Sequence, residues 1–208
     1  YSEKLEKLGL DISRDEIVTS GWLTGQYILE KFPKSEIFVL GEEGLKEELL
    51  EAEANLTEEP GSADVLVVSN KSDLSYDDFV ELVQGINKDI EILGTNPDET
   101  IPGDEGLIPG AGTVISAVET MLGKDAKIIG KPSKNAVNTV TGLKDVEAEQ
   151  CLMIGDRLNT DILMANENGM NGILVLSGVT DRETLERSDI SPKHVLNSIA
   201  DLPGIFRN

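Results

Sequence analysis

The stretch Cys151-Leu-Met-Ile-Gly-Asp-Arg-Leu-Asn-Thr-Asp-Ile162 joins a short apolar run to a polar turn that begins at Gly155. The apolar run predicts a buried strand, and Gly155 allows a sharp turn because it has no Cβ atom. In a parallel α/β sheet, the loops at the carboxyl ends of the strands line the ligand crevice. We therefore expect Asp156, directly after this strand, to lie where a ligand binds.

A second carboxylate, Asp161, follows in the same stretch and is close enough to return to the same loop as the next helix begins. Two carboxylates on one turn suit a hard cation such as Mg²⁺. The same residues also fit a simple turn at Gly155 and Asp156, followed by a helix cap at Asp161. On these residues alone, both interpretations stay open.

The composition limits the classes of partner. The 208 residues include 18 Lys and Arg against 39 Asp and Glu, a formal net charge of -21, so nucleic acid and anionic membranes would be repelled. An anionic substrate would need local cations. The single cysteine rules out a disulfide framework and favours a reducing compartment. The lack of an apolar run of membrane-spanning length favours a soluble protein, so we expect the cytoplasm.

Apolar runs and amphipathic segments alternate along the chain, which predicts an α/β fold with a mainly parallel sheet. The expected strands are 16–20, 37–40, 63–68, 90–93, 126–129, 151–155 and 172–176. The expected helices are 2–8, 21–32, 42–54, one opening at Ser75, 113–122, 134–143, 161–168 and a short one near 180–183. No internal repeat or low-complexity segment competes with this pattern.

Two further segments are candidates for the site. Residues 94–112 lack periodicity and are rich in turn formers, so we expect a long irregular connection at a domain crossing, with Asn96 and Asp98 facing the crevice. Lys131 follows the strand expected at 126–129, which would bring its ammonium group to the same crevice as Asp156. An ordinary surface lysine is the alternative.

The chain has one histidine, His194, and one cysteine, Cys151, so a zinc site or a Ser-His-Asp hydrolase is nearly excluded. Cys151 lies in an apolar strand with no histidine beside it in the sequence, which favours a small core side chain over a nucleophile. We expect a structural or exposed role for His194.

An ordered set of motifs resembles the haloacid dehalogenase superfamily of phosphatases. In chain order they are Gly94-Thr-Asn-Pro-Asp98, Gly130-Lys-Pro-Ser133, Gly155-Asp-Arg-Leu-Asn-Thr-Asp-Ile162, Gly169-Met170 and Leu174-Val-Leu-Ser-Gly-Val179. The resemblance is to the branch that contains the 4-nitrophenylphosphatases, phosphoglycolate phosphatases and NagD-like proteins. It implies a Rossmann-like three-layer core of residues 1–35 and 105–208, with an inserted α/β cap domain of residues 36–104.

The resemblance also implies roles for individual residues. Lys131 would be the catalytic lysine that balances charge between nucleophile and phosphate, and with Asn96 and Arg157 it would bind the substrate. Asp156 would bind Mg²⁺, and Asp161 would support that loop as part of the metal site. Phosphoryl transfer needs such positive charge around the phosphate oxygens. The expected partner is a small phosphorylated metabolite. The oligomeric state stays open, with a homodimer as one option.

The sequence departs from that family at two places. Asn159 stands where relatives most often carry aspartate, which we expect to have a small effect. The larger departure is that no Asp-x-Asp pair follows an apolar strand, so the nucleophile of the implied aspartyl-phosphate chemistry is missing. We expect it upstream of Tyr1. The alternative is a non-catalytic binding or regulatory protein that keeps the fold without turnover.

Overall fold

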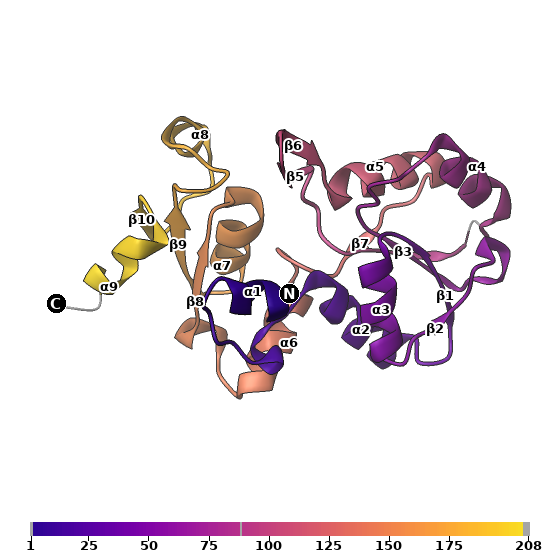
Figure 1. Cartoon of the computed structure of the whole chain (residues 1–208), viewed down its shortest axis with the longest axis horizontal. Coiled ribbons are helices and arrows are strands. Elements are labelled where there is room, and N and C mark those ends of the chain that lie inside the picture. Colours follow the sequence, from indigo (N-terminus) through magenta and orange to yellow (C-terminus); the bar gives the residue numbers. More distant parts are fainter. Residues whose placement is uncertain (1, 88, 206–208) are drawn as a thin grey trace. The chain divides into compact units, whose positions relative to one another are not determined.

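The computed structural model describes residues 2–87 and 89–205, and the contacts between residues divide the chain into two compact units (Figure 1). Unit 1 comprises residues 1–95 and 99–130. Unit 2 comprises residues 96–98 and 131–208. Within the described residues, no helix is both long enough and apolar enough to cross a membrane.

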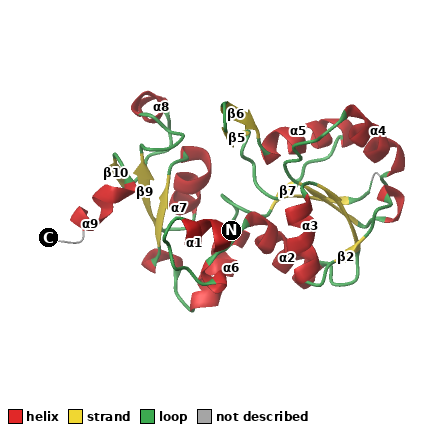
Figure 2. Ribbon diagram, viewed as in Figure 1, coloured by secondary structure: helices red, strands yellow, loops and turns green. Residues whose placement is uncertain are grey.

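Unit 1 contains a parallel sheet with the strand order β2-β1-β3-β4-β7. Figure 2 draws its strands in yellow and the helices in red. The strands of this sheet are β1 (Glu36–Leu40), β2 (Asn55–Leu56), β3 (Val65–Val68), β4 (Glu91–Gly94) and β7 (Lys127–Ile128). Every residue of β3 is buried. Because side chains alternate between the two faces of a strand, this burial requires both faces of the sheet to be covered.

The helices of unit 1 are α1 (Ser2–Lys7), α2 (Ser20–Lys31), α3 (Glu43–Glu51), α4 (Tyr76–Gly85) and α5 (Ala111–Leu122), with short 3-10 turns η1 (Arg14–Glu16) and η2 (Pro60–Ser62). Helices α4 and α5 pack on the strands, since Leu82 of α4 and Val118 of α5 share a buried cluster with Leu66 of β3. Helices α2 and α3 pack closely on each other, since a Cβ atom on Gly25 would lie only 2.7 Å from Cβ of Ala52.

Unit 2 contains a smaller parallel sheet with the order β10-β9-β8. Its strands are β8 (Leu152–Gly155), β9 (Asn171–Val175) and β10 (His194–Leu196). Its helices are α6 (Lys134–Lys144), α7 (Leu163–Glu167), α8 (Arg182–Arg187) and α9 (Leu202–Ile205), with 3-10 turns η3 (Ala148–Gln150) and η5 (Ile199–Asp201) and a π-helical turn η4 (Leu158–Ile162). Leu158, Ile162 and Leu174 form a buried cluster beneath the loop that follows β8.

The predicted α/β class with a mainly parallel sheet is confirmed, and most expected helices and strands lie within a few residues of their predicted limits. The strand expected at 16–20 is wrong. Thr19 instead caps α2 by accepting a hydrogen bond from the backbone N–H of Trp22, so that the helix begins at Ser20. The strand β10 was not expected from the sequence.

The irregular connection expected at 94–112 contains an antiparallel hairpin. Strand β5 (Thr100–Gly103) pairs with β6 (Gly106–Pro109), and Gly103 lies opposite Gly106. Gly106 has a φ of 137°, a backbone conformation that glycine adopts and side-chain-bearing residues rarely do. The glycines that looked like markers of irregular structure are therefore the ends of a tight turn.

The two units have limits that differ from the expected cap of residues 36–104. Residues 20–31 and 111–122 belong with the five-stranded sheet, because α2 packs on α3, and α5 packs on β3 and β4. The assignment of one unit as cap and the other as core stays a prediction.

Candidate active site at the end of strand β8

The loop after β8 is built around the buried carboxylate of Asp161. Its Oδ2 atom accepts hydrogen bonds from the backbone N–H groups of Asp156 and Arg157, both at 3.1 Å. Its Oδ1 atom accepts a hydrogen bond from Nζ of Lys131 at 2.6 Å. With its side chain only 3% exposed, Asp161 has both oxygens committed to holding this loop and Lys131 together.

The close packing of this loop explains the glycine at its start. A Cβ atom on Gly155 would lie 2.2 Å from Cγ of Asp161, a distance that no side chain could accept without displacing the carboxylate. The π-helical turn η4 then carries Asp161 back over Gly155, with Leu158 and Ile162 directed into the core. This turn therefore needs a glycine at position 155, a buried carboxylate at Asp161, and the two apolar side chains of Leu158 and Ile162 in the core.

Asp156 is also held by the segment after β9. Its Oδ2 atom accepts a hydrogen bond from the backbone N–H of Val179 at 2.8 Å, and its carbonyl oxygen accepts one from Thr180 at 3.1 Å. A Cβ atom on Gly178 would lie 2.0 Å from Oδ2 of Asp156. The motif at Leu174–Val179 therefore fixes the orientation of the Asp156 carboxylate.

Lys131 provides the accessible positive charge of the site. Its side chain is 48% exposed, while its ammonium group is hydrogen-bonded to the buried Asp161. The residues after it begin α6, whose first turn is capped by the Ser133 hydroxyl accepting from the N–H of Ala136. Pro132 therefore precedes the residue that caps this helix.

Arg157 and Asp98 form an ion pair beside this loop, with 3.7 Å between Nη1 and Oδ1. Both side chains are mostly buried, at 14% and 22% exposure. Burial raises the pKa of the Asp98 carboxyl, and the positive charges of Arg157 and Lys131 oppose that rise. Asn96 lies in the same segment, and its Oδ1 atom accepts from the N–H of Asp98 at 3.1 Å.

The structure thus joins Lys131, Asp156 and Asp161 through hydrogen bonds, although the strands β7 and β8 that precede Lys131 and Asp156 belong to different sheets. It also links Arg157 to Asp98, a pairing that the sequence did not indicate, because the two residues lie far apart in the chain. The signal in the sequence was the turn-forming Asn-Pro-Asp, which marked the segment but not its partner. The substrate-binding roles of Asn96 and Arg157 stay predictions.

The donors at this loop suit Mg²⁺ in type. Carboxylate oxygens are hard ligands, and Mg²⁺ in phosphoryl-transfer sites is commonly held by one or two carboxylates together with waters and substrate oxygens. Within residues 2–87 and 89–205, no three His, Cys, Asp or Glu side chains are grouped to hold a metal ion. Asp156 therefore fits as one member of a partial coordination sphere rather than of a closed protein cage.

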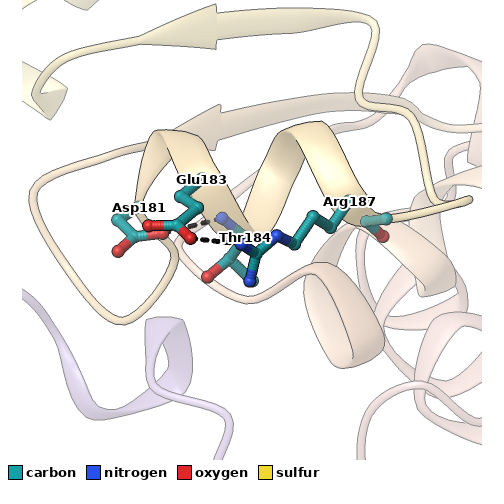
Figure 3. A pocket seen from close by; sticks show the side chains of 5 residues that line it. Asp181, Glu183, Thr184 and Arg187 are labelled. Carbon is teal, nitrogen blue, oxygen red and sulfur yellow. Dashed lines mark hydrogen bonds and ion pairs between the residues drawn. The ribbon is translucent and has the colours of Figure 1, made fainter.

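Two other hollows lack comparable chemistry. One lies beside α8, where Asp181 caps the helix at the N–H of Thr184 and Arg187 pairs with Glu183 on the exposed surface (Figure 3). The other, in unit 1, is lined by Lys46 and Lys71, which already pair with carboxylates. The Arg187–Glu183 pair is exposed and contributes little, and the Lys71–Asp78 pair, although less exposed, belongs to the cap of α4.

Cys151 and His194 take no part in the loop after β8. Cys151 precedes β8 and its Sγ lies 3.5 Å from the carbonyl oxygen of Glu147. His194 begins β10 and is exposed. The exposed position of His194 agrees with the expectation, whereas Cys151 is half-buried and lies before the strand, so its expected place as a core side chain within the strand is wrong.

Comparison with known proteins identifies the class. The family model described as haloacid dehalogenase-like hydrolase matches residues 1–55, and the HAD-hydrolase-like model matches residues 128–202. The chain belongs to the haloacid dehalogenase-like hydrolases, in the branch of NagD-like proteins and 4-nitrophenylphosphatases. It is a phosphatase, a phosphoric monoester hydrolase.

Individual relatives cover nearly all of the chain. It is 32% identical over 205 residues to a dihydroxyacetone phosphatase of Corynebacterium glutamicum, covering 97% of this chain and 72% of the relative. The p-nitrophenyl phosphatase from Archaeoglobus fulgidus superposes with a TM-score of 0.90 at 30% identity, covering 98% of this chain and 79% of that one. The 4-nitrophenylphosphatase from Thermotoga maritima gives a TM-score of 0.90 at 31% identity, covering 98% and 78%.

Proposed function

We propose that the protein is a Mg²⁺-dependent phosphatase that hydrolyses small phosphate monoesters, of the size of 4-nitrophenyl phosphate or phosphoglycolate, through an aspartyl-phosphate intermediate. The observation that carries this proposal is the hydrogen-bonded group of Lys131, Asp161 and the backbone of Asp156 at the carboxyl end of a parallel strand. Such strand ends are where ligands bind in α/β folds.

Each residue of this group has a distinct task in the proposal. Lys131, half-exposed but held by Asp161, balances the negative charge of the phosphate and of the attacking carboxylate. Asp161 has no free oxygen for a metal in this arrangement, so we assign it to positioning and Asp156 to direct Mg²⁺ binding. When bound, Mg²⁺ supplies positive charge to the phosphate oxygens.

The chemistry needs a carboxylate that attacks phosphorus. Its oxygen forms a bond to phosphorus as the bond to the ester oxygen breaks, and the alcohol leaves with a proton from the second aspartate of the implied Asp-x-Asp pair, which later takes a proton from the attacking water. Water then attacks the same phosphorus, which releases inorganic phosphate and restores the carboxylate. Because the 208 residues contain no Asp-x-Asp pair, we propose that this aspartate lies upstream of Tyr1.

The names of the relatives support a small phosphorylated metabolite as the substrate, since one is a dihydroxyacetone phosphatase and others are named for 4-nitrophenyl phosphate. The relatives also favour the enzyme over a non-catalytic binding protein of the same fold. Location in the cytoplasm is a further part of the proposal, supported by the composition.

A substrate panel tests this proposal. The full-length enzyme is assayed for phosphate release from 4-nitrophenyl phosphate, phosphoglycolate and dihydroxyacetone phosphate, with Mg²⁺ or with a chelator. We expect Mg²⁺-dependent release from monoesters and none from the matched diester bis(4-nitrophenyl) phosphate. In the Lys131→Met variant, which keeps the length of the side chain without its charge, turnover should fall at least about 100-fold. Equal rates on monoester and diester would refute the proposal.

A further inference from the structure

Asp98 has surroundings that a simple turn residue would not need. Its side chain is mostly buried, and its buried Oδ1 atom makes no hydrogen bond within the described part of the chain. A buried carboxylate is costly unless it is paired. The charge that it faces is the guanidinium of Arg157, at 3.7 Å. A neutral side chain would make the same turn at lower cost, so the charge of Asp98 calls for an explanation.

The segment around Asp98 is itself fixed. The N–H of Asp98 donates to Oδ1 of Asn96, which closes a tight turn at the Asn-Pro-Asp sequence. This turn places the carboxylate in unit 2, together with Arg157 and the rest of the loop after β8. The Asp98 carboxylate is therefore attached to a short segment whose backbone is held by a hydrogen bond.

Arg157 connects Asp98 to the residues that carry the chemistry. Its side chain faces Asp98, while its backbone N–H donates to Oδ2 of Asp161 at 3.1 Å. The same oxygen of Asp161 accepts from the N–H of Asp156. Moving the Arg157 side chain would therefore disturb the backbone immediately next to Asp156. The Val179 contact holds the Asp156 carboxylate and does not hold this part of the backbone.

We propose that Asp98 is a positioning residue for the metal site: its carboxylate holds the Arg157 side chain, and Arg157 holds the loop that presents Asp156 to Mg²⁺. This inference rests on the proposed function, because it takes Asp156 as a metal ligand. Residues that orient metal ligands through such contacts commonly change metal affinity by about 10- to 100-fold when they are substituted. We expect an effect at the lower end of that range.

Calorimetric titration of the full-length enzyme with Mg²⁺ tests the proposal. Asp98→Asn, which keeps the shape and removes the charge, should weaken Mg²⁺ binding about tenfold. Asp98→Glu, which keeps the carboxylate, should retain more of the affinity. Asp189→Asn removes the same charge from an exposed position of the same unit and should leave the affinity unchanged. At saturating Mg²⁺, the kcat of Asp98→Asn should return toward the wild-type value.

The coupling between the two partners gives a second measurement. Arg157→Gln should weaken Mg²⁺ binding to a similar extent, and the double variant should be no weaker than either single variant. If Asp98→Asn does not fold, Arg157→Lys takes its place, since it keeps the charge and loses the guanidinium shape. A folded Asp98→Asn or Arg157→Lys enzyme with wild-type Mg²⁺ affinity would overturn the proposal.

These outcomes separate the positioning role from the proposed function. If the wild-type enzyme neither binds Mg²⁺ nor hydrolyses monoesters, the function itself is wrong. If the wild type does both and the Asp98 variants bind Mg²⁺ equally well, only the positioning role is wrong. A purely structural ion pair would lower the melting temperature of Asp98→Asn without changing the affinity of the folded enzyme.

Discussion

Asp161 is the side chain on which the loop after β8 depends. Its two oxygens accept three hydrogen bonds, from Lys131 and from the backbone of Asp156 and Arg157. Hydrogen bonds to an ionised acceptor are roughly twice as strong as neutral ones, and a buried carboxylate left without them would be strongly unfavourable. One residue therefore sets both the direction of the lysine and the shape of the turn.

Asp156 and Asn159 lie in the same loop and should respond differently to substitution. Asp156→Asn removes one charge from the proposed Mg²⁺ ligands, so we expect turnover at fixed Mg²⁺ to fall by at least about 100-fold. Asn159→Asp adds a charge to the same loop outside the hydrogen bonds that hold it, and should change turnover little. Steady-state kinetics across a Mg²⁺ series, with both variants in the full-length enzyme, measures this. Equal effects of the two variants would contradict the assignment of Asp156.

Gly178 should tolerate no side chain, because a Cβ atom there would collide with the Asp156 carboxylate. Gly178→Ala is expected to lower the free energy of unfolding by about 1–3 kcal/mol, the usual range for overpacking. Gly142 of α6 is the matched control, since a Cβ atom there meets nothing within 4 Å. Gly142→Ala should stabilise the helix by up to about 1 kcal/mol. Urea unfolding measures the change in the free energy of unfolding for both variants, which should be negative for Gly178→Ala and positive for Gly142→Ala. A Gly178→Ala variant as stable as wild type would contradict the predicted collision, because the loop would then have moved to accept the Cβ atom.

The sequence predicted much of this site because Lys131, Asp156 and Asp161 each follow or flank a predicted strand end. The expected reason, two strands that end at the same edge of one sheet, is wrong, because β7 and β8 belong to different sheets. Lys131 instead meets Asp161 within unit 2, through a direct hydrogen bond. The commitment of both Asp161 oxygens could not be predicted, since it depends on backbone N–H directions inside the turn. Nor could the pairing of Asp98 with Arg157, which depends on tertiary placement of a separate segment.

At the scale of elements, helix α4 shows how local residues specify a boundary. Ser75 and Asp78 form a capping box in which the Asp78 carboxylate accepts hydrogen bonds from the hydroxyl and the backbone N–H of Ser75, at 2.6 and 2.7 Å. These bonds, the hydroxyl first, hold the pKa of Asp78 below its ordinary value of 3.8, with a smaller contribution from Lys71. This boundary was predicted from the sequence pattern alone.

The cap leads to a pH-dependent prediction. A carboxylate whose pKa is lowered by folding stabilises the folded state above its unfolded-state pKa, and that stability is lost as the pH falls through the folded value. Asp78→Asn should therefore lower the free energy of unfolding by up to about 1 kcal/mol at pH 7, and the difference from wild type should shrink below pH 3.8. Thermal unfolding at several pH values measures this.

Asp77 provides the control, because it carries the same charge in the same first turn without the capping contacts. Asp77→Asn should reduce the stability by less than Asp78→Asn at pH 7. A gap between Asp78→Asn and wild type that stays constant down to strongly acidic pH would contradict the capping explanation.

The elements that the sequence misplaced have a common physical cause. The apolar run at 16–20 lacks a neighbouring strand, and Thr19 is used to cap a helix. Strand β10 pairs with only one neighbour, β9, and His194 and Val195 in it are exposed, so its residues show no run of buried positions. Periodicity reports burial, and elements whose burial is partial or whose partner is distant leave a weak pattern.

At the scale of the whole molecule, the chain consists of two compact units, each with its own parallel sheet. The sequence predicted a cap of residues 36–104 in a core of 1–35 and 105–208, whereas the compact units divide near residues 95–99 and 130–131. Which unit is cap and which is core stays a prediction. Helices α2 and α5 belong to the five-stranded sheet through contacts that no local pattern encodes. Exclusion of nucleic acid and membrane partners by the charge of -21 remains a prediction from composition.

The central claim is that Lys131, Asp156 and Asp161 serve a Mg²⁺-dependent phosphoryl transfer whose acceptor lies outside these 208 residues. The most direct test is the rate of 4-nitrophenyl phosphate hydrolysis, measured against Mg²⁺ concentration, for the full-length enzyme and for a polypeptide of only these residues. We predict saturable, Mg²⁺-dependent turnover by the full-length enzyme and none by the shorter polypeptide. Robust Mg²⁺-dependent turnover by the 208-residue polypeptide would contradict the placement of the acceptor, and full-length turnover that is indifferent to Mg²⁺ would contradict the claim itself.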